Sequence, residues 1–167
     1  KPPAPANGGP APAVDPLSLP KLTYDVQMTM YMNGEAIELI PLPRAHTDGD
    51  TALRFPGVNV LMTGDVFRST GYPNIDLANG GSLVGIVTAL DKLVDLAGPE
   101  TKVLPGHGPI ADRAALVAHR DMVKLMRDRV AKLVAEGKTR DHVLARSEEH
   151  TSELQSHLNL VCRLLLE

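Results

Sequence analysis

Three glycine-containing turns, each carrying a histidine or an aspartate, constrain the fold of this chain more than any other feature. The motifs are Arg44-Ala45-His46-Thr47-Asp48-Gly49-Asp50, Thr63-Gly64-Asp65 and Pro105-Gly106-His107-Gly108. Glycine lets the backbone turn sharply, and loops that follow strands commonly carry functional side chains. Each motif follows a run of residues that predicts a β-strand. We therefore expect strand ends that bring His46, Asp65 and His107 towards a common point.

The first strand signals form a hairpin. Apolar residues alternate with mostly polar ones from Tyr24 to Met32, which predicts a strand with one buried face. Asn33-Gly34 is a typical two-residue hairpin turn, and residues 36–42 supply the returning strand. The sheet should therefore begin with two antiparallel strands.

Further strands precede the other two motifs. Residues 51–55 and 58–62 predict a second pair of short strands around Pro56-Gly57, and residues 102–104 predict another short strand. Asp65 should then stand just beyond the carboxyl end of a buried strand. Sheet proteins commonly place ligand-binding side chains there.

Two amphipathic helices complete the predicted domain. Ser82 is a good cap for a helix over residues 83–96, whose apolar residues form one stripe. Residues 111–136 predict a longer amphipathic helix, with His119 as a solvated or packing residue, and a further helix begins at Arg140. This mixture of strands and helices predicts an α/β (α+β) fold class.

The two ends of the chain differ from this domain. Residues 1–21 are rich in proline and alanine, which is typical of a loop or linker. Residues 146–167 begin with a stretch that looks like the conceptual translation of a DNA sequencing adapter, so we interpret them as an artefact. The predicted domain spans residues 22–145.

Composition excludes several classes of partner. The chain has 17 Lys and Arg and 20 Asp and Glu; residues 146–167 hold two and four of these, which leaves 15 and 16 elsewhere. This near-neutral balance carries no signature of binding to nucleic acid or to a membrane surface. The apolar runs are too short to span a membrane. The only cysteine, Cys162, lies in the excluded tail, so we expect neither disulfides nor thiolate ligands.

His46, Asp65 and His107 form a candidate metal site. Zinc favours imidazole nitrogen and carboxylate oxygen, and its ligands must converge from separate rigid elements. Taken singly, each residue has an ordinary explanation, since an exposed loop histidine and a Gly-Asp turn are common. Their shared position after strands, 19 and 42 residues apart, favours metal ligands.

At these residues the sequence resembles a known family. The three motifs look like the third, fourth and fifth motifs of the metallo-β-lactamase superfamily of hydrolases, and the resemblance covers residues 22–145. It implies half of a four-layered αβ/βα sandwich, with a site for two zinc ions between the sheets. By this resemblance His46 completes the first zinc site, Asp65 bridges both ions and is catalytic, and His107 belongs to the second.

The resemblance also implies an activity on small molecules. In the superfamily a metal-bound hydroxide attacks an ester, lactone, thioester or β-lactam carbonyl, while a metal takes up the developing negative charge. Asp48 and Asp50 are expected either to orient His46 without binding metal or to satisfy backbone amides of the loop.

A substrate-facing loop is predicted over residues 67–81. Its candidate contact residues are Phe67, Arg68, Tyr72 and Asn74. The alternative is that Tyr72-Pro73 packs under the helix that begins after Ser82.

One expected motif is missing from the 167 residues. The superfamily normally supplies its other ligands from a His-x-His-x-Asp-His sequence, which does not occur here. We therefore interpret the chain as the carboxyl-terminal half of such an enzyme, whose partner is the amino-terminal half of the same domain. Alone, it should be inactive and expose an apolar face. The alternatives are a non-catalytic binding module and a subunit completed by a second chain.

Overall fold

The computed structural model describes residues 15, 17 and 19–139. Most of the predicted linker over residues 1–21 lies outside these residues. The helix predicted from Arg140 and the adapter-like tail over residues 146–167 also lie outside them. Within the described part, no helix is long and apolar enough to cross a membrane.

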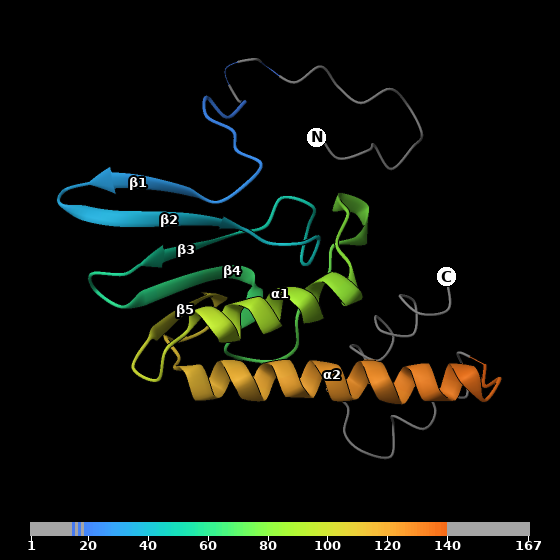
Figure 1. Cartoon of the computed structure of the whole chain (residues 1–167). Helices are drawn as coiled ribbons and strands as arrows, with labels where there is room; N and C mark the ends of the chain where they lie inside the picture. The colour runs from blue at the N-terminus through green and yellow to red at the C-terminus, as the bar shows by residue number, and fades with distance from the viewer. Residues whose placement is uncertain (1–14, 16, 18, 140–167) are drawn as a thin grey trace.

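A five-stranded sheet forms one layer of the molecule (Figure 1). Its strands are β1 (Met28–Met32), β2 (Glu35–Pro41), β3 (Thr51–Phe55), β4 (Val60–Arg68) and β5 (Lys102–His107), which lie side by side in chain order. β1 to β4 are antiparallel neighbours, whereas β5 is parallel to β4. Parallel neighbours need a crossover, and α1 (Leu83–Leu96) supplies it here.

The predicted hairpin is confirmed, although its first strand is shorter than expected. Met32 pairs with Glu35, and the two residues between them, Asn33 and Gly34, have φ values of 52° and 78°. Two left-handed residues of this kind match the twist of the flanking strands. β1 begins only at Met28, because the chain bends at Asp25 and Val26. Tyr24 lies outside the strand, with its hydroxyl 2.7 Å from the Thr51 hydroxyl.

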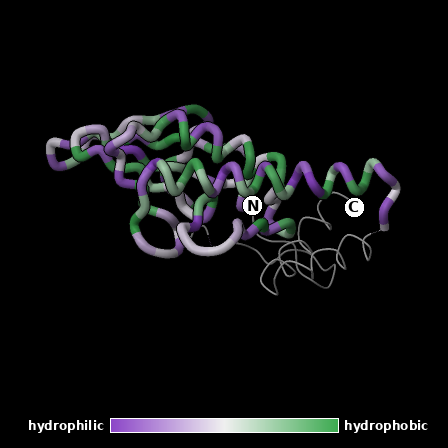
Figure 2. Tube along the Cα trace, turned by 90° about the horizontal axis from the view of Figure 1, so that it is seen from below, coloured by the Kyte–Doolittle hydropathy of each residue, from purple (hydrophilic) through white to green (hydrophobic). Residues whose placement is uncertain are grey.

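Both predicted helices are present with side-chain caps. Ser82 accepts a hydrogen bond from the Gly85 amide at 3.3 Å at the start of α1. α2 (Arg113–Ala135) begins two residues later than predicted, because Asp112 accepts from the Ala115 amide at 2.8 Å. Each cap satisfies an amide that has no partner within its helix. The last turns of α2 extend past α1 and the sheet in both views (Figures 1 and 2).

Both helices pack against one face of the sheet and form the second layer. The core joins residues from β2, β3, β4 and β5 to the buried faces of the helices, and it includes Ile40, Ala52, Leu61, Val66, Val103, Ile86, Leu90, Leu93, Leu116 and Val123. The prediction of a mixed α/β fold is confirmed. Its two layers correspond to half of a four-layered sandwich.

The opposite face of the sheet is also apolar. One residue from each strand forms a continuous row across it, through the pairs Met28–Leu39, Leu39–Leu53, Leu53–Met62 and Met62–Leu104. We call these five residues the open-face row. Side chains alternate between the faces of a strand, so this row points away from α1 and α2. Met62, the β4 residue of this row, is 37% exposed, whereas its neighbour Leu61 on the helix face is fully buried.

Candidate metal centre

His46 stands in the loop between β2 and β3. The Leu42 amide donates to the Asp50 carbonyl at 2.9 Å, which closes this loop at its base. The Asp50 carboxylate accepts from the Thr47 amide at 3.0 Å and from the Thr47 hydroxyl at 3.1 Å. Asp50 therefore satisfies a loop amide, one of the two roles that the sequence left open. Asp48 is exposed, and its amide donates to the Asn79 carbonyl at 3.0 Å.

Asp65 lies inside β4, and not beyond its end as predicted. β4 begins at Val60 and continues to Arg68, because parallel β5 pairs with it on both sides of an irregular step at Gly64. Gly64 has a φ of 56°, and the register shifts on both sides of it. Such a bulge re-aims the side chain that follows. The bulge therefore places Asp65 without ending the strand.

His107 is the last residue of β5 and reaches the Asp65 carboxylate. Gly106 permits this close approach, because a Cβ atom there would overlap Asp65 Oδ1 and lie 2.7 Å from the Gly64 carbonyl carbon. After His107, the strand end is tied back to β4 by the Ser69 amide, which donates to the His107 carbonyl at 3.2 Å.

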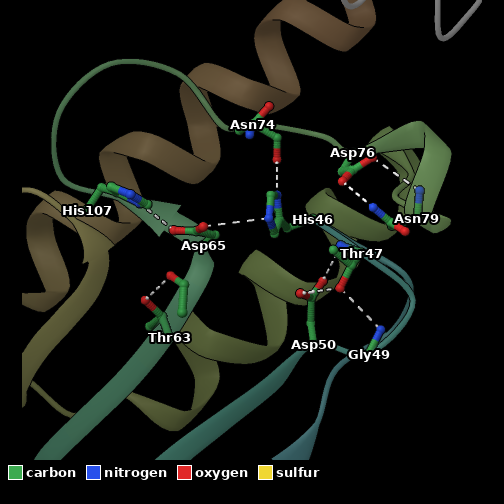
Figure 3. A network of polar contacts seen from close by, with 11 residues as sticks. His46, Thr47, Gly49, Asp50, Thr63, Asp65, Asn74, Asp76, Asn79 and His107 are labelled. Atoms are coloured by element: carbon green, nitrogen blue, oxygen red, sulfur yellow. Dashed lines mark hydrogen bonds and ion pairs between the residues drawn. The ribbon is translucent and has the colours of Figure 1, made fainter. Parts of the chain in front are cut away.

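The three predicted residues meet at the Asp65 carboxylate (Figure 3). His107 Nδ1 lies 2.6 Å from Asp65 Oδ1, and His46 Nε2 lies 3.6 Å from Asp65 Oδ2. Each imidazole thus faces one carboxylate oxygen. The side chains are 17% exposed for His46, 28% for Asp65 and 60% for His107, so solvent reaches the site.

The donor types fit zinc, although the described residues contain no group of three or more His, Cys, Asp or Glu placed to hold an ion. Two donors bound to one tetrahedral zinc ion lie roughly 3.3 Å apart, given bonds of about 2.0–2.2 Å. The 3.6 Å between His46 Nε2 and Asp65 Oδ2 is close to this spacing. The 2.6 Å between His107 and Asp65 is instead a hydrogen bond.

The predicted substrate loop begins two residues later than expected. Phe67 and Arg68 belong to β4, and Phe67 is 1% exposed, with its ring edge-to-face against His119 at 5.2 Å. Arg68 Nε is buried and has no hydrogen-bond partner among the described residues. Tyr72 is half-buried, and the following residue, Pro73, is buried. Phe67 therefore packs in the core and does not face a substrate.

Asn74 contacts the site through its backbone. Its carbonyl oxygen lies 2.8 Å from His46 Nδ1 (Figure 3). Sequence reasoning selected Asn74 for its side chain and missed Asp76, whose amide donates to the His46 carbonyl at 2.9 Å. The signal for Asp76 was its spacing to Asn79, since an aspartate commonly accepts from an amide a few residues later in a turn. Hydrogen bonds from the Asn79 side chain and then the Asn79 amide lower the pKa of Asp76.

His119 is a buried residue of α2, as the packing interpretation predicts. It is 8% exposed, and its Nε2 has no hydrogen-bond partner among the described residues. Burial disfavours the charged imidazolium and lowers the pKa of His119 from 6.5 to about 4. Near neutral pH it is therefore an uncharged packing residue against Phe67.

Comparisons of the fold identify its class. No family model and no curated protein match the sequence. Among solved structures, a stereoselective inverting sec-alkylsulfatase from a Pseudomonas species matches 84% of this chain and 26% of its own, with a TM-score of 0.67 and 16% identity. A metallo-β-lactamase family protein from Thermus thermophilus matches 69% of this chain and 39% of its own, with a TM-score of 0.58 and 20% identity.

A metallo-β-lactamase from Pontibacter korlensis matches 63% of this chain and 49% of its own, with a TM-score of 0.52 and 22% identity. The chain therefore has the metallo-β-lactamase fold, as the three motifs indicated. It spans between about a quarter and a half of the length of these three proteins.

Proposed function

We propose that this chain carries part of the active site of a zinc-dependent hydrolase. The observation that carries the proposal is the position of the Asp65 carboxylate, which has one oxygen towards His46 and the other towards His107. The fold that positions these residues is similar to the folds of a sulfatase and of a β-lactamase. The expected reaction is attack of water on an ester, lactone, thioester or β-lactam carbonyl of a small molecule.

Each residue of the site has a role in this proposal. His46 Nε2 and Asp65 Oδ2 would hold one zinc ion, and Asp65 Oδ1 and His107 would contribute to a second. Zinc supplies Lewis acidity and lowers the pKa of a bound water to near neutrality. Asp65 is central, because its two oxygens face different imidazoles. The exposed side of His107 leaves the site open to a substrate.

A sulfate ester is the first substrate class that we would test beside the carbonyl compounds. The alkylsulfatase shares 84% of this chain, whereas the lactamase from Pontibacter korlensis shares 63%. Inorganic sulfate released from a secondary alkyl sulfate would be measured, because lactones and β-lactams yield none.

We further propose that the chain works together with the amino-terminal half of the same domain. The open-face row is apolar and points away from both helices, as expected for a surface that meets a second layer. That half would supply the remaining zinc ligands, so this chain alone should not hydrolyse substrate. The coding sequence before Lys1 tests the idea. A His-x-His-x-Asp-His motif there supports it, and a natural start close to Lys1 without that motif contradicts it.

Zinc titration of the chain tests the site itself. Calorimetry should show binding that Asp65→Asn weakens at least about tenfold, because the central donor is lost. Asp95→Asn is the matched control, since Asp95 is an exposed residue of α1. Equal zinc binding by the wild type and by Asp65→Asn would contradict the site. It would place the bound zinc elsewhere in the chain.

A further inference from the structure

Residues 74–82, which we call the His46 clamp, lie against the loop that carries His46 (Figure 3). The Asp76 amide donates to the His46 carbonyl at 2.9 Å. In the opposite direction, the Asp48 amide donates to the Asn79 carbonyl at 3.0 Å. The clamp is therefore bonded to His46 and to the residue two positions after it.

Two glycines allow the clamp and α1 to approach this loop closely. A Cβ atom on Gly81 would overlap the His46 carbonyl oxygen and lie 2.9 Å from the Asp76 amide nitrogen. A Cβ atom on Gly85 would overlap the Arg44 carbonyl oxygen. Backbone atoms cannot move aside as a flexible side chain can. The backbone around His46 is therefore enclosed by the clamp and by the first turn of α1.

The clamp also sets which imidazole nitrogen of His46 carries hydrogen. The Asn74 carbonyl lies 2.8 Å from Nδ1, and a carbonyl oxygen only accepts hydrogen bonds. Nδ1 must therefore be the donor. In neutral His46, Nε2 then has the free lone pair, and it faces Asp65 Oδ2 at 3.6 Å. Two acceptors that face each other are stabilised by a cation between them.

We propose that the His46 clamp is a positioning element of the metal centre and that Asp76 is its positioning residue. The clamp holds His46 as the Nδ1–H tautomer and aims Nε2 at the Asp65 carboxylate, with which it would hold a zinc ion. The role in metal binding rests on the proposed function, whereas the tautomer follows from the contacts alone. A carbonyl that accepts from the second nitrogen of a metal-binding histidine fixes its tautomer and ring orientation.

Asp76 is bonded to His46 through the backbone, and its carboxylate shapes the turn that makes this contact. One carboxylate oxygen accepts from the Asn79 amide at 3.1 Å and the other from the Asn79 side-chain amide at 2.7 Å. These bonds cap the short helical turn η2 (Leu77–Asn79). The Asp76 carbonyl also accepts from the Gly81 amide at 2.7 Å. Loss of the carboxylate should loosen the turn and with it the contacts to His46.

Nitrogen-15 NMR of the imidazole groups tests the proposal on the full chain without zinc. The wild type should show His46 with a protonated Nδ1 and an unprotonated Nε2, and added Zn²⁺ should shift the Nε2 signal. In Asp76→Ala the tautomers should mix, and zinc affinity should fall about tenfold or more. Asp76→Asn should retain the single His46 tautomer and the wild-type zinc affinity, because an amide oxygen still accepts from the Asn79 amide. Asp95→Ala is the matched control.

The outcomes separate this proposal from the proposed function. A protonated Nε2 in zinc-free wild-type protein would overturn the clamp, and this result does not depend on whether any variant folds. If a folded Asp76→Ala variant kept the wild-type tautomer of His46 and the wild-type zinc affinity, the role of Asp76 would be overturned. The expected tautomer together with no shift on adding Zn²⁺ would refute the metal-positioning role and the proposed function, while the tautomer assignment itself would stand.

Discussion

At the scale of single residues, the geometry of the site depends on a glycine that leaves room for its neighbours. Gly106 has no Cβ, which lets β5 approach the Asp65 carboxylate and the Gly64 backbone. The contact of 2.6 Å between His107 and Asp65 follows from this approach. Gly106 therefore shapes the candidate metal centre, although it offers no side-chain donor.

Gly106→Ala should destabilise the fold and disturb the site. Its Cβ would overlap Asp65 Oδ1, so β5 has to move, at a cost of about 2 kcal/mol or more in the free energy of unfolding. Gly98→Ala is the matched control, because its Cβ would lie 3.5 Å from the Thr101 hydroxyl, an ordinary contact. Urea denaturation of both variants measures the difference. Equal midpoints would show that Gly106 is not a close-approach position.

His119 should make stability depend on pH below neutrality. Its pKa is about 4 in the folded chain and near 6.5 when exposed, so the unfolded chain takes up the proton first as pH falls. Its contribution is fully present above pH 6.5 and is lost as pH falls towards 4, by roughly 3 kcal/mol. His119→Leu should remove this loss. Urea midpoints at pH 7 and pH 4.5 test it, and an equal drop in both proteins would assign the effect to other groups.

At the scale of elements, local signals were sufficient for the strands and helices but not for the bulge. Asn33-Gly34 and the Ser82 cap act on their immediate neighbours, so the hairpin and α1 could be read from the sequence. The bulge at Gly64 depends on pairing with β5, about forty residues later. The predicted strand therefore ended at Met62, and Phe67 was assigned to a loop instead of the core.

The bulge makes a specific prediction for Gly64. Its φ of 56° is left-handed and a Cβ would meet nothing within 4 Å, so only the backbone opposes a side chain there. Gly64→Ala should cost about 1–2 kcal/mol, and Gly64→Asn less, because asparagine tolerates this conformation better. Gly49→Ala is the control, since Gly49 is equally open and has no positive φ. A loss of stability as large in Gly49→Ala would contradict this explanation.

At the scale of the whole molecule, the site could be predicted only in part. The positions of His46, Asp65 and His107 after strands indicated that they would meet, and the structure brings them together. The contact of Asn74 with His46 joins residues 28 positions apart through a backbone atom. No side-chain pattern in the sequence encodes such a contact. The burial of His119 against Phe67 likewise follows from how α2 packs on β4.

The open-face row should cause the isolated chain to self-associate. Exposed apolar surface of this kind usually marks an interface, and Met62 lies within the row at 37% exposure. Met62→Lys should shift the chain towards monomer in sedimentation velocity. Val84→Lys is the matched control, because Val84 is 64% exposed on α1, away from the row. A monomeric wild type, or equal effects of both changes, would contradict an interface at this face.

X-ray absorption of the zinc-loaded chain would show whether His46, Asp65 and His107 bind zinc. With one equivalent of Zn²⁺, the spectrum should show nitrogen and oxygen donors with imidazole scattering. This scattering should decrease in the double variant His46→Ala/His107→Ala. It should persist in the control His142→Ala/His150→Ala, which removes two histidines outside the three motifs. Imidazole scattering that persists in the first variant and disappears in the second would place zinc elsewhere and contradict the account.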